Sequence, residues 1–273
     1  MSDLYCVFGN PVNHSRSPDI HHAFAAQRGE DVHYEKREAP LSGFPEAVAS
    51  FFTSGGRGAN VTVPFKEEAY ALCNDLSERA RQAGAVNTLW QRDGRLHGDN
   101  TDGAGLMADL RHNLGWKIEN RRVLLLGAGG AMRGILGPLL SYKPSQVLIA
   151  NRTASKAQTL AELFHGSGVP VYGTSLDGLR GSFDLIINGI SAGLHGEMPD
   201  LPADLVKPGS VAYDMVYGKE PTPFLRWAEA AGALATADGL GMLVEQAAEA
   251  FFLWRGWRPD TVPVMKMLRR DAP

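Results

Sequence analysis

Three polar residues, Asn60, Thr62 and Lys66, lie close together in the sequence at the end of a predicted buried strand. In residues 58–66, small and apolar residues alternate with Asn60 and Thr62, the pattern of a strand with two unlike faces. Pro64 has no N–H to donate and ends the strand pairing, so that a helix can begin at Lys66. Open α/β sheets bind their ligands at the carboxyl ends of strands. An amide, a hydroxyl and an ammonium at that edge suit a small molecule rich in hydroxyl groups and carbonyl oxygen.

A second polar cluster, residues 99–103, precedes another predicted helix. Its Asp102 lies after an extended segment, as Lys66 does, so that both side chains are expected at the same edge of the sheet. The alternative is that Asp102 only caps the helix that begins at about Ala104. The shared position of Asp102 and Lys66 favours a functional role.

Ser15 and Ser17 lie in a polar loop between an apolar strand, residues 4–8, and a helix. Their hydroxyls are expected beside the free N–H groups of the helix start, facing the ligand. The alternative for Ser17 is helix capping alone, because Ser followed by Pro18 is a common helix start. Ser15 has less structural reason to be there. The nearby histidines are interpreted as loop and helix-surface residues rather than ligands: His14, His21 and His22.

Residues 127–131, Gly-Ala-Gly-Gly-Ala, follow the clearest core strand and open a helix. Gly127 permits a tight turn, Gly129 allows close approach of the backbone to a pyrophosphate, and the helix N-terminus supplies N–H groups and positive dipole. The pattern departs from Gly-x-Gly-x-x-Gly because Met132 stands where the third glycine is expected. A purely structural turn is the alternative, but the strand–turn–helix context favours a dinucleotide site.

The next strand, residues 146–150, ends in Asn151, Arg152 and Thr153, with Lys156 one helical turn further on. An acidic residue at that position would bind the ribose 2′-hydroxyl of NAD, and none is present. Basic residues at a helix N-terminus oppose the helix dipole, which argues against a purely structural role. This segment therefore favours NADP, whose 2′-phosphate the cationic side chains can bind.

The length of 273 residues and the alternation of predicted strands and helices favour two α/β domains. Residues 1–101, with 240–273 returning to complete them, are expected to form the substrate-binding domain around a mixed sheet, with a hairpin turn at Asp93–Gly94. Residues 102–239 are expected to form a Rossmann-type parallel sheet that binds NADP. The ligand site is expected between the domains, and closure would bring the nicotinamide to the substrate.

Bulk composition excludes several classes of protein. The net charge of -3 over 273 residues gives no support to nucleic-acid binding, and 44% hydrophobic content suffices for sizeable cores. No apolar run approaches the ~18 residues of a membrane span, and the first residues lack a signal-peptide pattern. The two cysteines, Cys6 and Cys73, have neither disulfide-framework nor metal-site spacing. These features favour a soluble, cytoplasmic protein, and no His/Cys/Asp cluster suggests a metal site.

Taken together, the motifs resemble those of the shikimate dehydrogenase family over nearly the whole chain. The matching segments are residues 13–18, 60–66, 84–88, 100–103, 127–131, 151–153, 217, 222–223 and 238–246. One such motif would be weak evidence, whereas so many in the family's order are highly specific. Gly-Ala-Gly-Gly-Ala is the usual turn of this family, so that Met132 is no departure within it.

The resemblance implies NADPH-dependent, reversible reduction of 3-dehydroshikimate to shikimate in aromatic amino-acid biosynthesis. It implies that Lys66 is the proton donor and acceptor, paired with Asp102. It also implies substrate-binding roles for Ser15, Ser17, Asn60, Thr62, Asn87, Asp102, Tyr217 and Gln246. The implied cofactor-binding residues are Glu78, Gly127, Ala128, Gly129, Gly130, Ala131, Asn151, Arg152, Thr153, Ala154, Ser155, Lys156, Met215 and Gly239.

Two other functions remain open. One is a quinate/shikimate dehydrogenase with relaxed cofactor use, against which Thr62 and the basic residues 151–153 argue moderately. The other is a non-catalytic sensor of NADP or of a pathway metabolite, which would not need a proton donor such as Lys66. A monomer or homodimer is expected, with neither a membrane nor a nucleic acid as partner.

Overall fold

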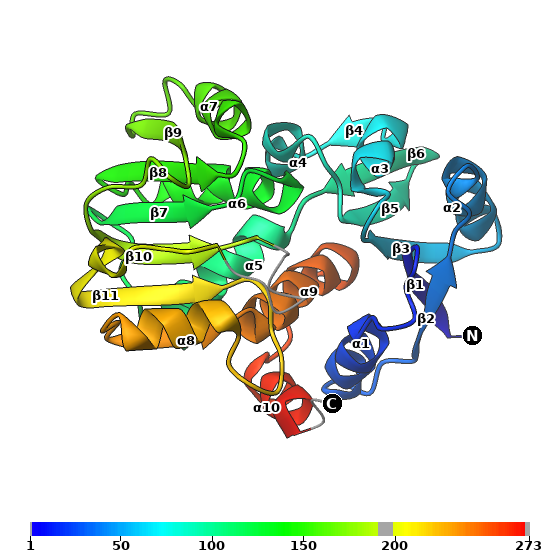
Figure 1. The fold of residues 1–273 in the computed structure, drawn as a ribbon. Helices are drawn as coiled ribbons and strands as arrows, with labels where there is room; N and C mark the ends of the chain where they lie inside the picture. Colours follow the sequence, from blue (N-terminus) through cyan, green and yellow to red (C-terminus); the bar gives the residue numbers. More distant parts are fainter. Residues whose placement is uncertain (1, 191–198, 271–273) are drawn as a thin grey trace. The chain divides into compact units, whose positions relative to one another are not determined.

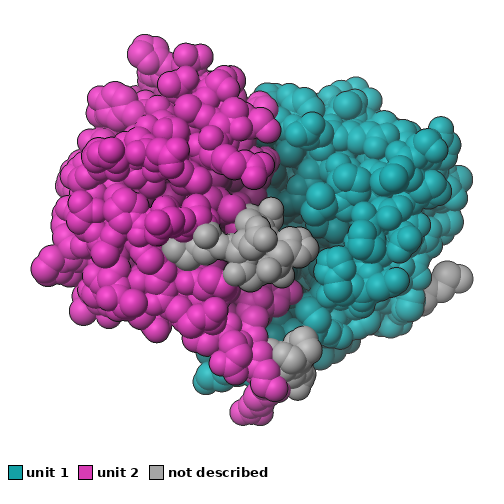
Figure 2. Space-filling view, viewed as in Figure 1, with its two compact units in different colours: residues 1–105, 243–268 teal, residues 106–242, 269–273 magenta. Residues whose placement is uncertain are grey.

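The computed structural model describes residues 2–190 and 199–270 and divides into two compact units (Figure 2). Unit 1 comprises Met1–Gly105 and Leu243–Leu268, and unit 2 comprises Leu106–Met242 and Arg269–Pro273. Each unit contains its own six-stranded sheet, so that the predicted fold class of two α/β domains is confirmed. The predicted boundaries, 101/102 and 239/240, lie a few residues before those of the structure. Asp102 consequently belongs to unit 1.

Unit 1 is built on a mixed sheet in the order β2-β1-β3-β5-β6-β4 (Figure 1). Its strands are β1 (Asp3–Gly9), β2 (Val32–Glu38), β3 (Gly56–Val61), β4 (Asp75–Leu76), β5 (Thr88–Arg92) and β6 (Arg95–Asp99). The hairpin between β5 and β6 has positive φ at Asp93 (51°) and Gly94 (72°). These angles match a two-residue turn with the twist that antiparallel strands require, as the sequence predicted.

The register of this sheet gathers several polar residues at one edge. Because β5 runs antiparallel to both neighbours, Thr88 at its start pairs with Asn60 near the end of β3 and with Asp99 at the end of β6. Phe8 of β1 pairs with Val61 in the parallel direction. Strands β1, β3 and β6 therefore end where β5 begins. The loops after these three strands and the residue before β5 all lie at this one edge of the sheet.

The helices of unit 1 come from both ends of the chain. They are α1 (Ser17–Ala26), α2 (Phe44–Thr53), α3 (Lys66–Leu72), α4 (Glu78–Ala83) and most of α9 (Leu240–Arg255) and α10 (Val262–Arg270), while α5 (Asp102–Ala108) continues into unit 2. The aromatic rings of Phe8, Phe44, Phe51 and Phe65 form a buried core with β3. Burial of such a side chain contributes about 1.5–3 kcal/mol, which anchors α2 and α3 against the sheet.

Unit 2 contains an all-parallel sheet in the order β12-β11-β10-β7-β8-β9. Its strands are β7 (Arg122–Leu126), β8 (Gln146–Asn151), β9 (Val171–Ser175), β10 (Phe183–Asn188), β11 (Val206–Asp214) and β12 (Ala235–Asp238). Numbered within the unit, this is the Rossmann order, in which the direction of winding reverses between β7 and β10. Ligands of such sheets bind beyond the carboxyl ends of the strands at that reversal.

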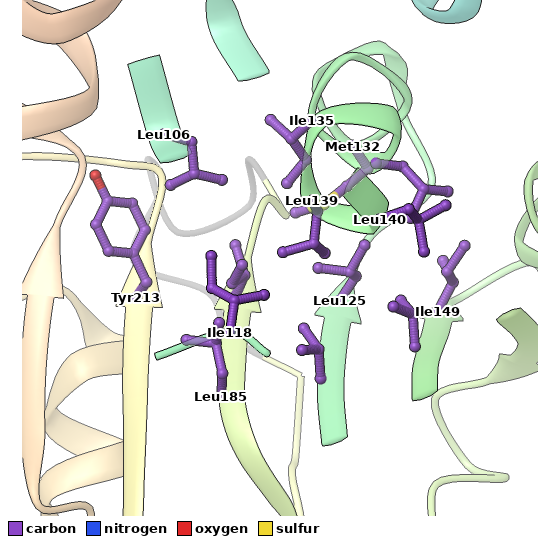
Figure 3. Close-up of a cluster of buried hydrophobic side chains, with 14 of the residues drawn as sticks. Leu106, Ile118, Leu125, Met132, Ile135, Leu139, Leu140, Ile149, Leu185 and Tyr213 are labelled. Atoms are coloured by element: carbon purple, nitrogen blue, oxygen red, sulfur yellow. The ribbon is translucent and has the colours of Figure 1, made fainter. Parts of the chain in front are cut away.

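The helices of unit 2 complete the layers around this sheet. They are α6 (Gly130–Ser141), α7 (Ala154–Glu162), α8 (Pro223–Ala230), the π-helical turn η1 (Asp109–Asn113) that extends α5, and the short η3 (Ala203–Leu205). Figure 3 shows the core in which Met132 and Leu139 of α6 lie near Leu125 and Ile149 of the sheet, all fully buried. Across residues 2–190 and 199–270, no helix has the length and apolar character needed to cross a membrane.

Candidate active site

Lys66 and Asp102 form an ion pair at the polar edge of the unit 1 sheet. The Nζ of Lys66, the first residue of α3, donates to Oδ2 of Asp102, the first residue of α5, at 2.6 Å. The side chain of Lys66 is 31% exposed and that of Asp102 is 13% exposed. A lysine ammonium has three N–H donors, of which Asp102 takes one. The pair therefore places a charged proton donor where a ligand can reach it.

The second oxygen of Asp102 accepts a hydrogen bond from Asn87, which directly precedes β5. Asn87 Nδ2 lies 2.8 Å from Asp102 Oδ1. The backbone N–H of Asp102 is bound instead by the side chain of Asn100, at 3.1 Å. Both carboxylate oxygens of Asp102 are thus used by side chains rather than by helix N–H groups, and Asn100 fills the capping role that was the alternative for Asp102.

Asn60 is buried, and its amide is engaged on both sides. The last four residues of β3 are all buried, so that the strand face that carries Asn60 is buried as well as the apolar face. Asn60 Oδ1 accepts from the Tyr34 hydroxyl at 2.8 Å, and Nδ2 donates to the Asn87 carbonyl at 3.1 Å and to Thr88 Oγ1 at 3.3 Å. The structure therefore places Asn60 at the site as a link between strands.

The two serines lie together after β1. Ser15 Oγ and Ser17 Oγ are 3.1 Å apart, and the N–H of Ser17 donates to Ser15 Oγ at 3.3 Å. Ser17 is the first residue of α1, and Arg16 occupies the capping position without a side-chain cap. The capping interpretation of Ser17 is therefore wrong, because Ser15 rather than Ser17 satisfies an N–H at this helix start.

Thr62 and Gln246 approach the same edge from β3 and α9. The N–H of Thr62 donates to the carbonyl of Phe8, and a Cβ on Gly9 would lie 2.6 Å from the Thr62 methyl, so that glycine is needed there. Gln246 Oε1 lies 3.4 Å from Thr101 Oγ1 and 3.5 Å from Asn87 Nδ2. Gln246 is half-buried beside the polar cluster, because α9 packs closely on α5 at Gly105.

Sequence reasoning missed two aromatic residues behind these groups. His21 is 1% exposed, so that its interpretation as a helix-surface residue is wrong. Its ring stacks on Tyr34, with centroids 4.4 Å apart and 5° between the planes. The spacing of Ser17, His21 and Phe24 along α1 places all three on the buried face, which was the available signal.

The turn after β7 in unit 2 has the geometry of a phosphate-binding turn. Gly127 is buried at φ +109°, a conformation that side chains rarely adopt. Gly129 and Gly130 are exposed, and a Cβ added to either would meet open space. The following helix α6 begins at Gly130, so that its free N–H groups lie beside that space. These residues fit the pyrophosphate of a dinucleotide, with backbone donors and helix dipole facing the anion.

Met132 explains the absence of the third glycine. Its side chain is fully buried, and its Cε occupies the space that a Cβ on Gly189 would fill, at 2.2 Å. Gly189 directly follows β10, the strand on the other side of the winding reversal, and a Cβ on Gly127 would lie 3.4 Å from its backbone. The close approach that a third glycine usually permits is therefore provided by Gly189, with methionine as the complementary residue.

A basic, exposed segment follows β8. Asn151 is half-buried at the strand end and its Nδ2 donates to the Thr153 carbonyl at 3.0 Å. Ala154 begins α7, and Arg152, Ser155 and Lys156 are exposed. Among the residues with described positions, neither Arg152 nor Lys156 forms an ion pair, so that both cations can bind a phosphate group.

The remaining predicted residues are placed as follows. Met215 follows β11, and its carbonyl lies 2.2 Å from where a Cβ on Gly239 would stand, so that these two residues meet in unit 2. Tyr217 is 40% exposed and also belongs to unit 2. Glu78 is exposed at the start of α4 and accepts from Gln82. It belongs to unit 1, whereas the other predicted cofactor residues belong to unit 2.

Comparison with known proteins gives consistent matches along the chain. The matching family models describe the shikimate dehydrogenase substrate binding domain over residues 7–89, shikimate/quinate 5-dehydrogenase over residues 109–195, and the shikimate 5'-dehydrogenase C-terminal domain over residues 239–269. A curated relative, shikimate dehydrogenase (NADP(+)) of Alcanivorax borkumensis, is 68% identical over 267 residues, which are 97% of this chain and 96% of the relative. This chain belongs to the shikimate dehydrogenase family.

Solved structures agree with this assignment. An Ael1 enzyme from Pseudomonas putida has a TM-score of 0.93 and 48% identity, covering 98% of each chain. Shikimate 5-dehydrogenase from Thermus thermophilus, in complex with NADP(H) and shikimate, has a TM-score of 0.87 and 36% identity, covering 98% of this chain and 99% of its own. The predicted family and the predicted class, an NADP-dependent oxidoreductase of the shikimate pathway, are confirmed.

Proposed function

We propose that this chain catalyses the NADPH-dependent, reversible reduction of 3-dehydroshikimate to shikimate, with Lys66 as the proton donor and acceptor. The observation that carries the proposal is the chain of contacts from Lys66 through Asp102 to Asn87, at the polar edge of the unit 1 sheet. A ligand-binding protein without catalysis would not need an ammonium held in place by a carboxylate. Family membership supports the reaction, and this geometry supports the role of each residue.

Unit 1 is the proposed substrate-binding domain. Ser15 and Ser17 offer neighbouring hydroxyls beside the start of α1, an arrangement that suits the substrate carboxylate. Thr62, Asn87 and Gln246 offer hydroxyl and amide groups for the ring hydroxyls. Asn60 belongs to the same group, and Tyr217 is proposed to assist at the carboxylate.

Lys66 provides the proton for the developing oxygen anion. Its Nζ keeps two N–H donors beyond the one that binds Asp102, and one of these can donate to the substrate oxygen as charge builds there. Asp102 restrains the ammonium and compensates its charge, while Asn87 prevents the carboxylate from rotating away. In the reverse direction, the neutral amine of Lys66 takes the proton from the hydroxyl.

Unit 2 is the proposed NADP-binding domain. When bound, NADPH supplies the hydride for the carbonyl carbon. Residues 127–131 are proposed to bind the pyrophosphate through backbone N–H groups, and residues 151–156 the 2′-phosphate through Arg152 and Lys156. Met215 and Gly239 are proposed to line the nicotinamide end. Glu78 remains a weaker proposal from the family pattern, and no metal takes part in the proposed mechanism.

Steady-state rates with shikimate and quinate, each with NADP+ and NAD+, test the proposal. Shikimate with NADP+ is expected to give the highest kcat/KM of the four combinations. Comparable turnover of quinate with NAD+ would instead favour a quinate/shikimate dehydrogenase. No turnover in any combination would contradict catalysis and favour a sensor.

A cytoplasmic location and a monomeric or homodimeric state complete the proposal. The free thiols of Cys6 and Cys73 support a reducing compartment. Light scattering during size-exclusion chromatography would distinguish a monomer from a homodimer, and a larger assembly would contradict both.

A further inference from the structure

The amide of Asn60 depends on a hydroxyl from outside the predicted site. The Tyr34 hydroxyl donates to Asn60 Oδ1 at 2.8 Å, across 26 residues of sequence. The other end of the amide donates to the Asn87 carbonyl and to Thr88 Oγ1. Without the Tyr34 hydroxyl, the buried Oδ1 of Asn60 would lose this hydrogen bond. The Asn60 side chain, and the groups that it binds, would then be held less firmly in position.

The effect of Asn60 reaches the proton donor through Asn87. The backbone carbonyl of Asn87 accepts from Asn60, while its side chain donates to Asp102, the partner of Lys66. A change in the position of Asn60 therefore moves the residue that orients the catalytic ion pair.

Tyr34 is itself held in a defined position. It is 2% exposed on β2, and its ring stacks on His21, which also contacts the rings of Trp254 and Phe24. Burial raises the pKa of Tyr34 well above its ordinary value, and a hydrogen bond with Ser17 opposes that rise. The phenol therefore keeps its proton for the hydrogen bond to Asn60.

We propose that Tyr34 is a positioning residue for the substrate, acting through the Asn60 amide, with His21 holding its ring in place. The inference rests on the proposed function, in which Ser17, Asn60 and Asn87 form the substrate side of the site. In this role Tyr34 need not touch the substrate, because its hydroxyl binds Asn60, which is proposed to do so.

Tyr34→Phe tests this role, and Tyr5→Phe is a matched control. Tyr5 pairs with Tyr34 in the parallel register and belongs to the same buried cluster, but its hydroxyl contacts Arg255. Loss of one net hydrogen bond at the site predicts that Tyr34→Phe raises the KM for shikimate by about fivefold or more. The KM for NADP+ is expected to stay within about twofold in both variants, and that for shikimate to stay so in Tyr5→Phe, since neither change touches a cofactor residue.

An equal effect of the two substitutions, or an equal rise in both KM values for Tyr34→Phe, would overturn the proposal and indicate a general loss of stability. A double-mutant cycle with Asn60→Ala sharpens the test. Tyr34→Phe should have little further effect on shikimate in the Asn60→Ala background, whereas full additivity would overturn the coupling. If Asn60→Ala does not fold, shikimate-induced thermal stabilisation of Tyr34→Phe and Tyr5→Phe provides the comparison, and equal stabilisation overturns the proposal.

Failure of this inference can be distinguished from failure of the proposed function. Failure of the wild-type protein to oxidise shikimate would contradict the proposed function. An active wild-type enzyme with an unaltered Tyr34→Phe variant would contradict only the role of Tyr34.

Discussion

Replacing Lys66 by methionine removes the ammonium while keeping most of the length of the side chain. Loss of a general acid lowers kcat by about 100- to 10,000-fold, so that a decrease of at least about 100-fold is expected. That decrease corresponds to about 2.7 kcal/mol of transition-state stabilisation. The lost ion pair with Asp102 is partly exposed, at 31% and 13% for the two side chains, and is expected to contribute at most about 1 kcal/mol to the free energy of unfolding. The variant should therefore fold and bind NADP+ while losing turnover.

The matched control is Lys207→Met. Lys207 Nζ lies 2.9 Å from Asp184 Oδ1 in unit 2, and the two side chains are 37% and 18% exposed, so that a similar ion pair is lost. The assay is the initial rate of NADPH formation at saturating shikimate and NADP+, with thermal unfolding measured on the same samples. If Lys66→Met retained a kcat within about tenfold of the wild type, or if Lys207→Met lost as much, the proton-donor role of Lys66 would be refuted.

Two further predictions concern the cofactor and acid stability. Arg152→Ala should weaken NADP+ binding by about tenfold or more and NAD+ binding by less than about twofold, because only NADP+ carries the 2′-phosphate. Titrations of both cofactors measure these affinities, and Arg226→Ala, which removes another exposed arginine, is the control. Equal losses of affinity for the two cofactors would refute the assignment. Burial lowers the pKa of His21 from 6.5 to about 3, so that the unfolded chain binds a proton that the folded chain excludes between these values. Above about pH 6.5 the buried His21 does not change the free energy of unfolding, and below that pH it lowers this free energy by about 1.36 kcal/mol per pH unit. Between pH 7 and 5, the free energy of unfolding of the wild type should therefore fall by about 2 kcal/mol more than that of His21→Phe. Urea unfolding at both pH values measures this difference, and an equal pH dependence would contradict it.

Local sequence signals predicted most of the elements that carry the site. The glycine turn at residues 127–131 and the strand–proline–helix run at residues 58–66 are short-range patterns, whose backbone preferences act within a few residues. Ser77 and Thr222 cap α4 and α8 through their side chains, another preference that acts within a few residues. The pairing of Lys66 with Asp102 was also expected, because each follows an extended segment that ends at the same edge of a sheet.

Only the tertiary structure decided which residues support that pair. The sequence by itself determined two α/β units, a glycine turn between a strand and a helix, and the polar residues at strand ends, because these depend on periodicity, turn chemistry and family motifs. It did not indicate that Tyr34 binds Asn60, that His21 is buried behind Tyr34, or that Gly189 makes room for Met132. These contacts join residues far apart in the chain, and strand order and register select them. Local preferences specify how each segment folds, whereas packing between segments determines which side chains meet.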